Sequence, residues 1–342
     1  IFTTNLLGAS IFHDIFVVVL KIPNVFRKLF AEGAFSQAFI PIYSEYIGSK
    51  DDKGSQDFLN ALFGILLSAL FIFTALALLF APMFILIFAP GFYFDIQKQD
   101  LAVSLLRIMF PYLALISLVA FAAGIQNSHN KFSIPAITPL IFNLSLIGSA
   151  WLVAPKIDIP VMALAWGVLL AGLLQLLFQI APLATIKKIP IPKIDFQNPG
   201  VKKFFILILP AIVAGGIAQI NLLIDTIFAS LLITGSPTWL YVSDRLIQFP
   251  MGIFAIAIGT VLLPSLSKAY SQKEVQAYTE QLEHAFKLVF FLAIPSLIGL
   301  ALFASPLLMG LPFSTPIEKD SINNIISFGS AAETNTYFLL PL

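Results

Sequence analysis

Residues 58–90 read FLNALFGILLSALFIFTALALLFAPMFILIFAP, a run of apolar and small side chains with no Asp, Glu, Lys or Arg. About 20 consecutive apolar residues allow an α-helix to cross the hydrocarbon core of a bilayer. Counting this run, eight stretches predict membrane spans: 11–43, 58–90, 101–126, 132–154, 159–184, 203–234, 238–266 and 285–311. The first is too long for a straight span, so we expect a tilt, a kink at Pro23 or an interfacial end over 34–43. The sequence therefore predicts an all-α, polytopic membrane helix bundle.

The composition agrees with this prediction and excludes several classes of protein. Of 342 residues, 58% are hydrophobic and 11% are charged, whereas roughly a quarter of a soluble domain is charged. The chain has no cysteine, which excludes disulfides, thiolate nucleophiles and cysteine-based zinc sites. A net charge of +1 gives no reason to expect a nucleic-acid partner. His13, His129 and His284 show no catalytic or metal-binding spacing, and no glycine-rich phosphate loop is visible, so we expect no enzyme.

Lysines in the predicted loops indicate the orientation of the chain in the membrane. The loops after the first, third, fifth and seventh spans contain ten of them: Lys50, Lys53, Lys131, Lys187, Lys188, Lys193, Lys202, Lys203, Lys268 and Lys273. The loops on the other side contain Lys98 and Lys156. The positive-inside rule places the lysine-rich side in the cytoplasm. Residues 185–202 (TIKKIPIPKIDFQNPGVK) form the longest polar interruption, which predicts a linker between two bundles.

An internal repeat suggests duplication, which is common among transporters. Residues 1–10 (IFTTNLLGAS) resemble residues 227–236 (IFASLLITGS), and residues 39–46 (FIPIYSEY) resemble residues 262–270 (LLPSLSKAY). An even number of predicted spans separates the copies, so the two repeats have the same orientation. The first copy begins inside a helix, and the membrane pattern is lost after residue 312. We therefore expect a chain that is truncated at both ends.

The first predicted span has an unusual number of charged side chains, which are costly in a bilayer and typically face a cavity or each other. At about 100° per residue, Asp14, Lys21, Lys28 and Glu32 share one face, with Arg27 beside them. A stripe of this length is expected to line water. The alternative is an interfacial ion pair between Lys28 and Glu32, with Lys21 extending toward the membrane surface.

Two later spans contain further charged candidates. Asp244 and Arg245 are adjacent on a predicted helix, where neighbouring side chains do not face each other, so Arg245 is available to the bundle interior. The planar guanidinium donates two parallel hydrogen bonds to a phosphate. Asp225 is the sole carboxylate of its span. It is expected to bind a cation, to transfer a proton or to pair with a basic neighbour.

The run KIPNVFRKLFAEGAFSQAFIPIYSEY (21–46) resembles the signature of the MurJ/MviN family, bacterial lipid II flippases of the multidrug/oligosaccharidyl-lipid/polysaccharide exporter superfamily. Three further stretches resemble the same family: LRIMFPYLALISL (106–118), NKFSIPAITPLIFNLSLIG (130–148) and residues 226–268. The resemblance extends from residue 1 to about residue 311.

The resemblance implies two pseudo-twofold-related bundles around a central cavity. It divides this chain into an N-terminal bundle over 1–184, without most of its first helix, a cytoplasmic linker over 185–202, and the start of a C-terminal bundle over 203–311. Residues 312–342 form a divergent tail, either soluble or frameshifted. The implied activity is transport of lipid II from the cytoplasmic to the periplasmic leaflet of the bacterial inner membrane, by alternating access in which the bundles rock about the linker.

The resemblance also implies roles for particular residues. Asp14, Arg27, Asp244 and Arg245 match charged positions of the family, and the stripe on the first span adds Lys21 and Glu32 as candidate substrate-binding residues. Asp225 matches a carboxylate that binds sodium in some members. We therefore expect energy coupling through sodium, a proton or the membrane potential, and no other cofactor. The expected partners are lipid II, membrane lipids and proteins of peptidoglycan synthesis.

Three alternatives remain open at this point. A sibling transporter would export drugs or another polyprenyl-linked oligosaccharide, although a drug pocket is expected to be acidic rather than basic. A scaffold for a membrane-bound synthase complex would move no lipid. A fragment without the arginine-bearing first helix and the last helices would be inactive.

Overall fold

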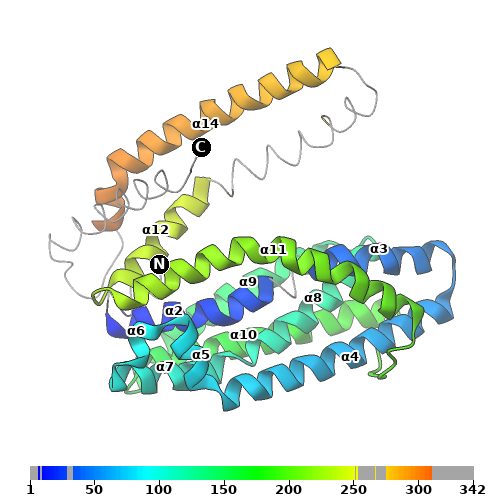
Figure 1. Ribbon diagram of the computed structural model, residues 1–342, viewed down its shortest axis with the longest axis horizontal. Helices are drawn as coiled ribbons and strands as arrows, with labels where there is room; N and C mark the ends of the chain where they lie inside the picture. The colour runs from blue at the N-terminus through cyan, green and yellow to red at the C-terminus, as the bar shows by residue number, and fades with distance from the viewer. Residues whose placement is uncertain are drawn as a thin grey trace. The chain divides into compact units, whose positions relative to one another are not determined.

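The computed structural model describes residues 7, 10–28, 34–250, 252, 266 and 275–309. Every regular element in these ranges is a helix (Figure 1), which confirms the predicted all-α fold. In chain order the elements are α2 (Ile11–Arg27), α3 (Ala34–Gly48), α4 (Asp52–Leu79), α5 (Ala81–Phe88), α6 (Pro90–Tyr93), α7 (Ile96–Met109), α8 (Tyr112–Ser128), α9 (Ser133–Gly148), η2 (Ser149–Val153), η3 (Ala154–Lys156), α10 (Pro160–Thr185), α11 (Pro199–Leu231), α12 (Ser236–Pro250) and α14 (Val275–Met309).

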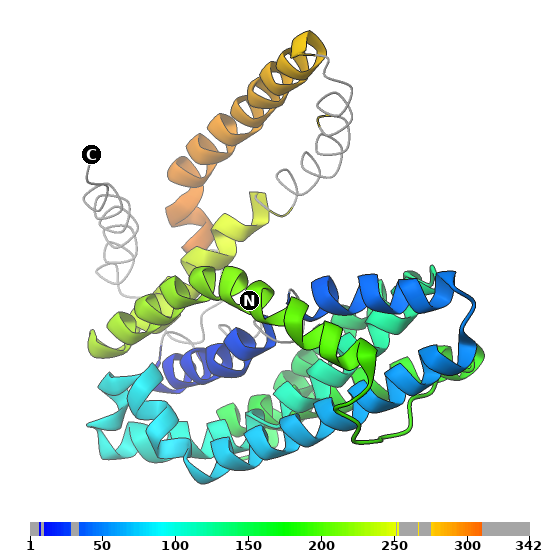
Figure 2. The same cartoon turned by 45° about the vertical axis from the view of Figure 1, so that its right-hand side comes forward.

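The chain divides into two compact units. The larger unit contains Ser10–Pro237 and helices α2 to α11; the smaller one contains the described residues from Thr238 onward, with most of α12 and all of α14. Within the larger unit α11 packs against α3, as Figure 2 shows. The chain passes from one compact unit to the other near residue 237, whereas the predicted bundles are 1–184 and 203–311. Because a sequence repeat need not coincide with a compact unit, the two bundles and the cavity between them stay predictions. The predicted tail over 312–342 lies outside the described residues.

The length and hydropathy of the helices agree with a multi-pass membrane protein. Six helical stretches of the described chain are long and apolar enough to cross a bilayer: Asp52–Leu79, Ile96–Ser128, Ser133–Lys156, Pro160–Thr185, Pro199–Ile217 and Tyr278–Leu302. Each overlaps a span predicted from the sequence. Of the predicted span 238–266, the structure describes α12 as far as Pro250, and nearly all of the rest lies outside the described residues.

The first two predicted spans each correspond to two helices. Residues 11–43 contain α2, which includes Pro23, and the start of α3. The inner face of α3 belongs to the protein core. An interfacial end over 34–43 stays a prediction. The stretch 58–90 is divided after Leu79, where α4 ends and α5 begins with Pro82 in its first turn. Proline is favoured there because the first turn needs no backbone donor.

Two clusters of aromatic rings hold the larger unit together and explain part of the high phenylalanine content. In the first, Phe39 lies 5.3 Å from Phe35 and from Tyr43, 5.4 Å from Phe121 and 5.9 Å from Phe58, measured between ring centroids. These rings come from α3, α4 and α8. Aromatic pairs contribute about 0.5–1.5 kcal/mol beyond their buried area. The cluster therefore fixes α3 against the two longer helices.

The second cluster fixes α2, the helix that contains three of the charged candidates. Phe26 of α2 lies 5.1 Å from Phe73, 6.3 Å from Phe84, 5.9 Å from Phe88 and 6.2 Å from Phe110. The partners belong to α4, to α5 and to the C-cap of α7. The charged end of α2 is thus anchored by the ring next to Arg27.

A buried group of polar side chains connects α8, α9 and α10. The Gln126 amide donates to Gln179, which donates to the Thr138 hydroxyl at 2.7 Å, and Gln175 donates to the Thr138 carbonyl oxygen at 3.1 Å. All four residues are buried. Amide and hydroxyl side chains commonly join helices in this way within membranes.

Candidate functional site

Asp14, near the start of α2, is a buried carboxylate with a long-range partner. Its side chain is only 2% exposed, and one oxygen accepts a 2.6 Å hydrogen bond from the backbone N–H of Gly235. Gly235 lies in the turn between α11 and α12 and has φ = 101°, a conformation that glycine adopts readily and other residues rarely do. The contact joins a buried carboxyl oxygen to a backbone donor that is far away in the sequence. Asp14 therefore holds this turn against the start of α2.

Arg27 and Lys21 lie further along the same helix and are half-buried. Arg27 donates from Nε to the Asn24 side-chain oxygen at 3.2 Å. With a rise of 1.5 Å per residue, Asp14 and Arg27 are roughly 20 Å apart along the helix axis, and Lys21 is roughly 10 Å from each. The stripe therefore cannot converge on one small group. Glu32, and with it the expected pair with Lys28, lies outside the described residues.

On α12, Arg245 is exposed and its described partners are neutral. The guanidinium carbon lies 5.1 Å from the centroid of the Tyr241 ring, and Nη1 donates to the Gln248 side-chain oxygen at 3.1 Å. Asp244 is half-buried and projects from a different side of the helix, as expected for a neighbour on a 100° repeat. Tyr241 and Gln248 are uncharged, so neither of them neutralises the positive charge of the guanidinium.

Asp225 is an exposed carboxylate near the C-terminal end of α11. In the described part of the chain, no group of three or more His, Cys, Asp or Glu side chains is placed to hold a metal ion. The role of Asp225 in binding sodium or a proton stays a prediction.

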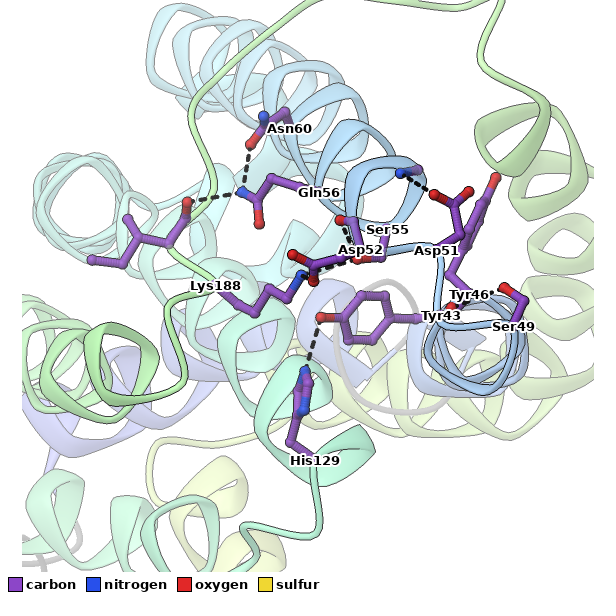
Figure 3. Close-up of polar contacts among 12 residues, drawn as sticks. Tyr43, Tyr46, Ser49, Asp51, Asp52, Ser55, Gln56, Asn60, His129 and Lys188 are labelled. Carbon is purple, nitrogen blue, oxygen red and sulfur yellow. Dashed lines mark hydrogen bonds and ion pairs between the residues drawn. The ribbon is translucent and has the colours of Figure 1, made fainter.

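A second set of polar residues gathers at the lysine-rich end of the larger unit, shown in Figure 3. Lys188, which follows α10, is only 8% exposed; its ammonium donates to the Asp52 carboxylate at 2.5 Å and to the Ser55 hydroxyl at 3.0 Å. We use the name linker network for these three residues together with Gln56 and Asn60 of α4 and the segment 186–198. Lys188 is one of the ten lysines of the predicted loops, and in the structure it also makes a structural contact.

The backbone of the linker is bound to α4 as well. The Gln56 amide donates to the Ile189 carbonyl at 3.1 Å, the Ile191 N–H donates to the Asn60 side chain at 2.8 Å, and the Lys193 N–H donates to the Asn60 carbonyl at 3.1 Å. Gly64 completes the contact, since a Cβ there would come within 2.4 Å of the Lys193 backbone. Residues 188–193 of the linker are therefore held against α4. The expected rocking of two bundles about it stays a prediction.

A histidine-tyrosine pair lies beside the linker network (Figure 3). The Tyr43 hydroxyl and His129 Nε2 share a hydrogen bond of 3.0 Å, and their rings meet edge to face. Burial lowers the pKa of His129 below its usual 6.5, and the Lys188 charge lowers this pKa further, against the opposing effect of Asp52. The neutral imidazole is therefore the form that the fold favours.

The sequence pattern did not indicate the linker network. Acidic residues before an apolar run are typical of a helix start, and Asp51 does cap α4 by accepting from the Gly54 N–H at 2.8 Å. Asn60 and His129 have no such local signal, because their contacts with Ile191 and Tyr43 join residues 131 and 86 positions apart in the chain.

Comparison with known proteins identifies relatives over nearly all of the chain. A family model described as lipid II flippase MurJ matches residues 3–311. A lipid II flippase MurJ from Burkholderia cenocepacia is 39% identical over 304 residues, which cover 88% of this chain and 59% of the relative. A probable lipid II flippase MurJ from Vibrio cholerae is 39% identical over 312 residues, 89% of this chain and 59% of the relative. The chain thus spans about three fifths of the length of these curated relatives.

Two solved structures have a similar fold. A lipid II flippase MurJ in an inward closed conformation superposes with a TM-score of 0.79 at 27% identity, over 95% of this chain and 67% of the other. An inward-facing multidrug resistance transporter of the MATE family superposes with a TM-score of 0.71 at 14% identity, over 95% of this chain and 74% of the other. The second likeness concerns the fold alone.

Proposed function

Because this chain, a multi-pass protein of the bacterial inner membrane, belongs to the lipid II flippase MurJ family, we propose that it moves lipid II from the cytoplasmic to the periplasmic leaflet. The observation that carries this proposal is the family match over residues 3–311, which includes α2, α11 and α12. The protein is a transporter in this proposal and catalyses no bond change.

The physical problem is the headgroup. Lipid II carries a sugar-peptide on a pyrophosphate, and a charged group taken out of water without a partner costs many kcal/mol. Cationic side chains at membrane depth replace the lost water, while the isoprenoid tail stays in lipid. Alternating access then exposes the headgroup to one side of the membrane at a time.

Arg245 and Arg27 are the proposed ligands of the pyrophosphate, with Lys21 as a further positive charge. Guanidinium groups suit this role because they stay charged and donate paired hydrogen bonds. Because Asp14 and Arg27 are roughly 20 Å apart along α2, they are proposed to have different roles. In the proposal Arg27 and Lys21 face the headgroup, whereas Asp14 acts through the turn at Gly235. Asp244 and Glu32 are proposed to shape the charge of the site.

Energy coupling is proposed to use sodium, a proton or the membrane potential, with Asp225 as the candidate ion-binding carboxylate. Its exposure is consistent with this role. Proteins of peptidoglycan synthesis are proposed as partners, and this part of the proposal rests on the substrate alone.

The family match and the basic side chains favour lipid II over the drugs or other oligosaccharides of a sibling exporter. The scaffold and the inactive fragment are outcomes that an experiment distinguishes from transport. We expect membrane vesicles containing this chain to expose the headgroup of labelled lipid II on the opposite side.

Arg245→Ala should slow this exposure by about tenfold or more, the equivalent of one charge-assisted hydrogen bond. Lys287→Ala is the matched control, because Lys287 is an exposed cation of the same unit that pairs with Glu283 at 2.7 Å. Vesicles in which the unmodified chain moves no lipid would refute transport and leave a scaffold or an inactive fragment.

A further inference from the structure

We propose that Tyr241 and Gln248 are positioning residues that hold the Arg245 guanidinium in place for the anionic headgroup. The inference rests on the proposed function and deepens it, since it assigns two neutral side chains to the recognition of the pyrophosphate. It starts from two contacts of Arg245 on α12: the Tyr241 ring at 5.1 Å and the Gln248 oxygen at 3.1 Å.

The three side chains form a row on one side of α12. Tyr241 lies four residues before Arg245 and Gln248 lies three residues after it, and these are the spacings at which helical side chains touch. The Tyr241 ring is itself held, because it packs against the buried pair Trp239 and Val242. The Tyr241 ring and the Gln248 amide, on either side of Arg245 along the helix, therefore limit the positions that the guanidinium can occupy.

The chemistry of the two partners matters as much as their position. An aromatic face attracts a cation without neutralising it, and an amide oxygen accepts a hydrogen bond with no formal charge. A carboxylate at position 248 would instead pair with Arg245 and compete with a phosphate. Of the five N–H groups of the guanidinium, the contact to Gln248 uses one from Nη1.

Preorganisation is the proposed advantage. An arginine side chain has many rotamers, and ordering it when the ligand arrives reduces affinity. A guanidinium that is already oriented loses less freedom on binding. Tyr241 and Gln248 thus increase affinity for the headgroup without contacting it.

The test measures binding to the purified chain in lipid nanodiscs. The probe is undecaprenyl pyrophosphate, and undecaprenol, which lacks the pyrophosphate, is its uncharged counterpart. Tyr241→Leu removes the ring and should weaken pyrophosphate binding by about two- to fivefold. Tyr241→Phe keeps the ring and should bind as the unmodified chain does. Gln248→Glu should weaken pyrophosphate binding too, and undecaprenol binding should stay the same in all three variants.

Arg245→Ala separates failure of this inference from failure of the proposed function. If it leaves pyrophosphate binding unchanged, or if the chain does not prefer the pyrophosphate to the alcohol, the proposed role of Arg245 is wrong. If Arg245→Ala weakens binding while Tyr241→Leu and Gln248→Glu do not, the positioning role alone is wrong. Equal losses in Tyr241→Leu and Tyr241→Phe would also overturn it, since they would implicate the hydroxyl.

A double mutant protects the test against a general loss of structure. If the ring acts through the guanidinium, Tyr241→Leu should have no further effect on pyrophosphate binding in an Arg245→Ala background. Independent, additive losses would contradict the inference. If Tyr241→Leu does not fold, pyrophosphate binding by Gln248→Glu still tests whether a neutral partner of Arg245 is required.

Discussion

The linker network and the α12 row both contain a cation, and they treat its charge in opposite ways. Lys188 is buried and its ammonium is paired with a carboxylate, so its charge is satisfied within the fold. Arg245 is exposed, and its described partners are an aromatic ring and an amide, which leave its charge in place. A cation that an acid neutralises holds segments of the chain together. A cation that neutral groups hold is suited to an anionic ligand.

If this contrast is right, changes in the linker network alter stability and hardly alter pyrophosphate binding, whereas changes in the α12 row do the reverse. Thermal unfolding in detergent and binding of undecaprenyl pyrophosphate, measured on the same preparations, distinguish the two regions. Four variants, at positions in the linker network or in contact with it, test its side of the contrast.

The largest effect is expected from Gly64→Ala. The new Cβ would lie 2.4 Å from the Lys193 backbone, so the linker must move away from α4, at a cost of about 1–3 kcal/mol typical of overpacking. Trypsin should then cut faster at Lys187 and Lys193. Gly148→Ala is the control, since its Cβ would meet nothing within 4 Å and alanine favours a helix by roughly 1 kcal/mol. Equal stability of the two variants would mean that the linker is not tightly held.

An intermediate loss of stability is expected when the ion pair between Lys188 and Asp52 is broken, and its size should depend on which of the two residues is replaced. The Asp52 side chain is 91% exposed, so Lys188→Met returns Asp52 to water and should lower stability only slightly. Asp52→Ala leaves Lys188 buried with Ser55 as its remaining described partner, and should lower stability more than Lys188→Met does. Urea or thermal unfolding of both variants gives the comparison. Losses of equal size would contradict the burial of Lys188 as the deciding factor.

The smallest effect is expected from pH. Because the folded state lowers the pKa of His129, the unfolded chain binds the proton more readily, and stability falls as the pH falls below the usual value of 6.5. The unfolding temperature of the chain should therefore decrease between about pH 7.5 and pH 5.5. His129→Gln keeps a hydrogen-bonding group toward Tyr43 and should show a smaller decrease. Identical pH profiles for both proteins would exclude His129 as the source.

How far the sequence predicts this molecule depends on the range of the interaction. The positions of the apolar helices follow from local hydropathy. Four of the eight predicted spans begin and end within five residues of the observed helical stretches: 101–126, 132–154, 159–184 and 203–234. The break after Leu79 was not predicted, because residues 58–90 are apolar on both sides of it. Pro82 lies in the first turn of the helix that follows the break. The resemblance of residues 21–46 to the MurJ/MviN family is likewise a property of the sequence, and the family match bears it out.

The candidate site was predicted in part. The charged residues of α2 and α12 are evident from sequence, because acids and bases are rare in apolar segments. Their partners are not: Gly235 is 221 residues from Asp14, and Lys188 is 136 residues from Asp52. No local pattern encodes such pairs. The neutral partners of Arg245 are close in sequence, at helical spacing, yet Tyr241 and Gln248 carry no charge that would draw attention to them.

By itself the sequence determined that this is an all-helical membrane protein of the MurJ family, because hydropathy over about 20 residues and short motifs are local properties. Only the tertiary structure decided which charges are paired and which keep their charge. That outcome depends on how the helices pack. Lys188 is buried and therefore requires an acidic partner, and the close approach of the Lys193 backbone requires glycine at position 64. On α12, helical spacing places the Tyr241 ring beside Arg245. Whether a charge serves the fold or a ligand is set by its surroundings in space.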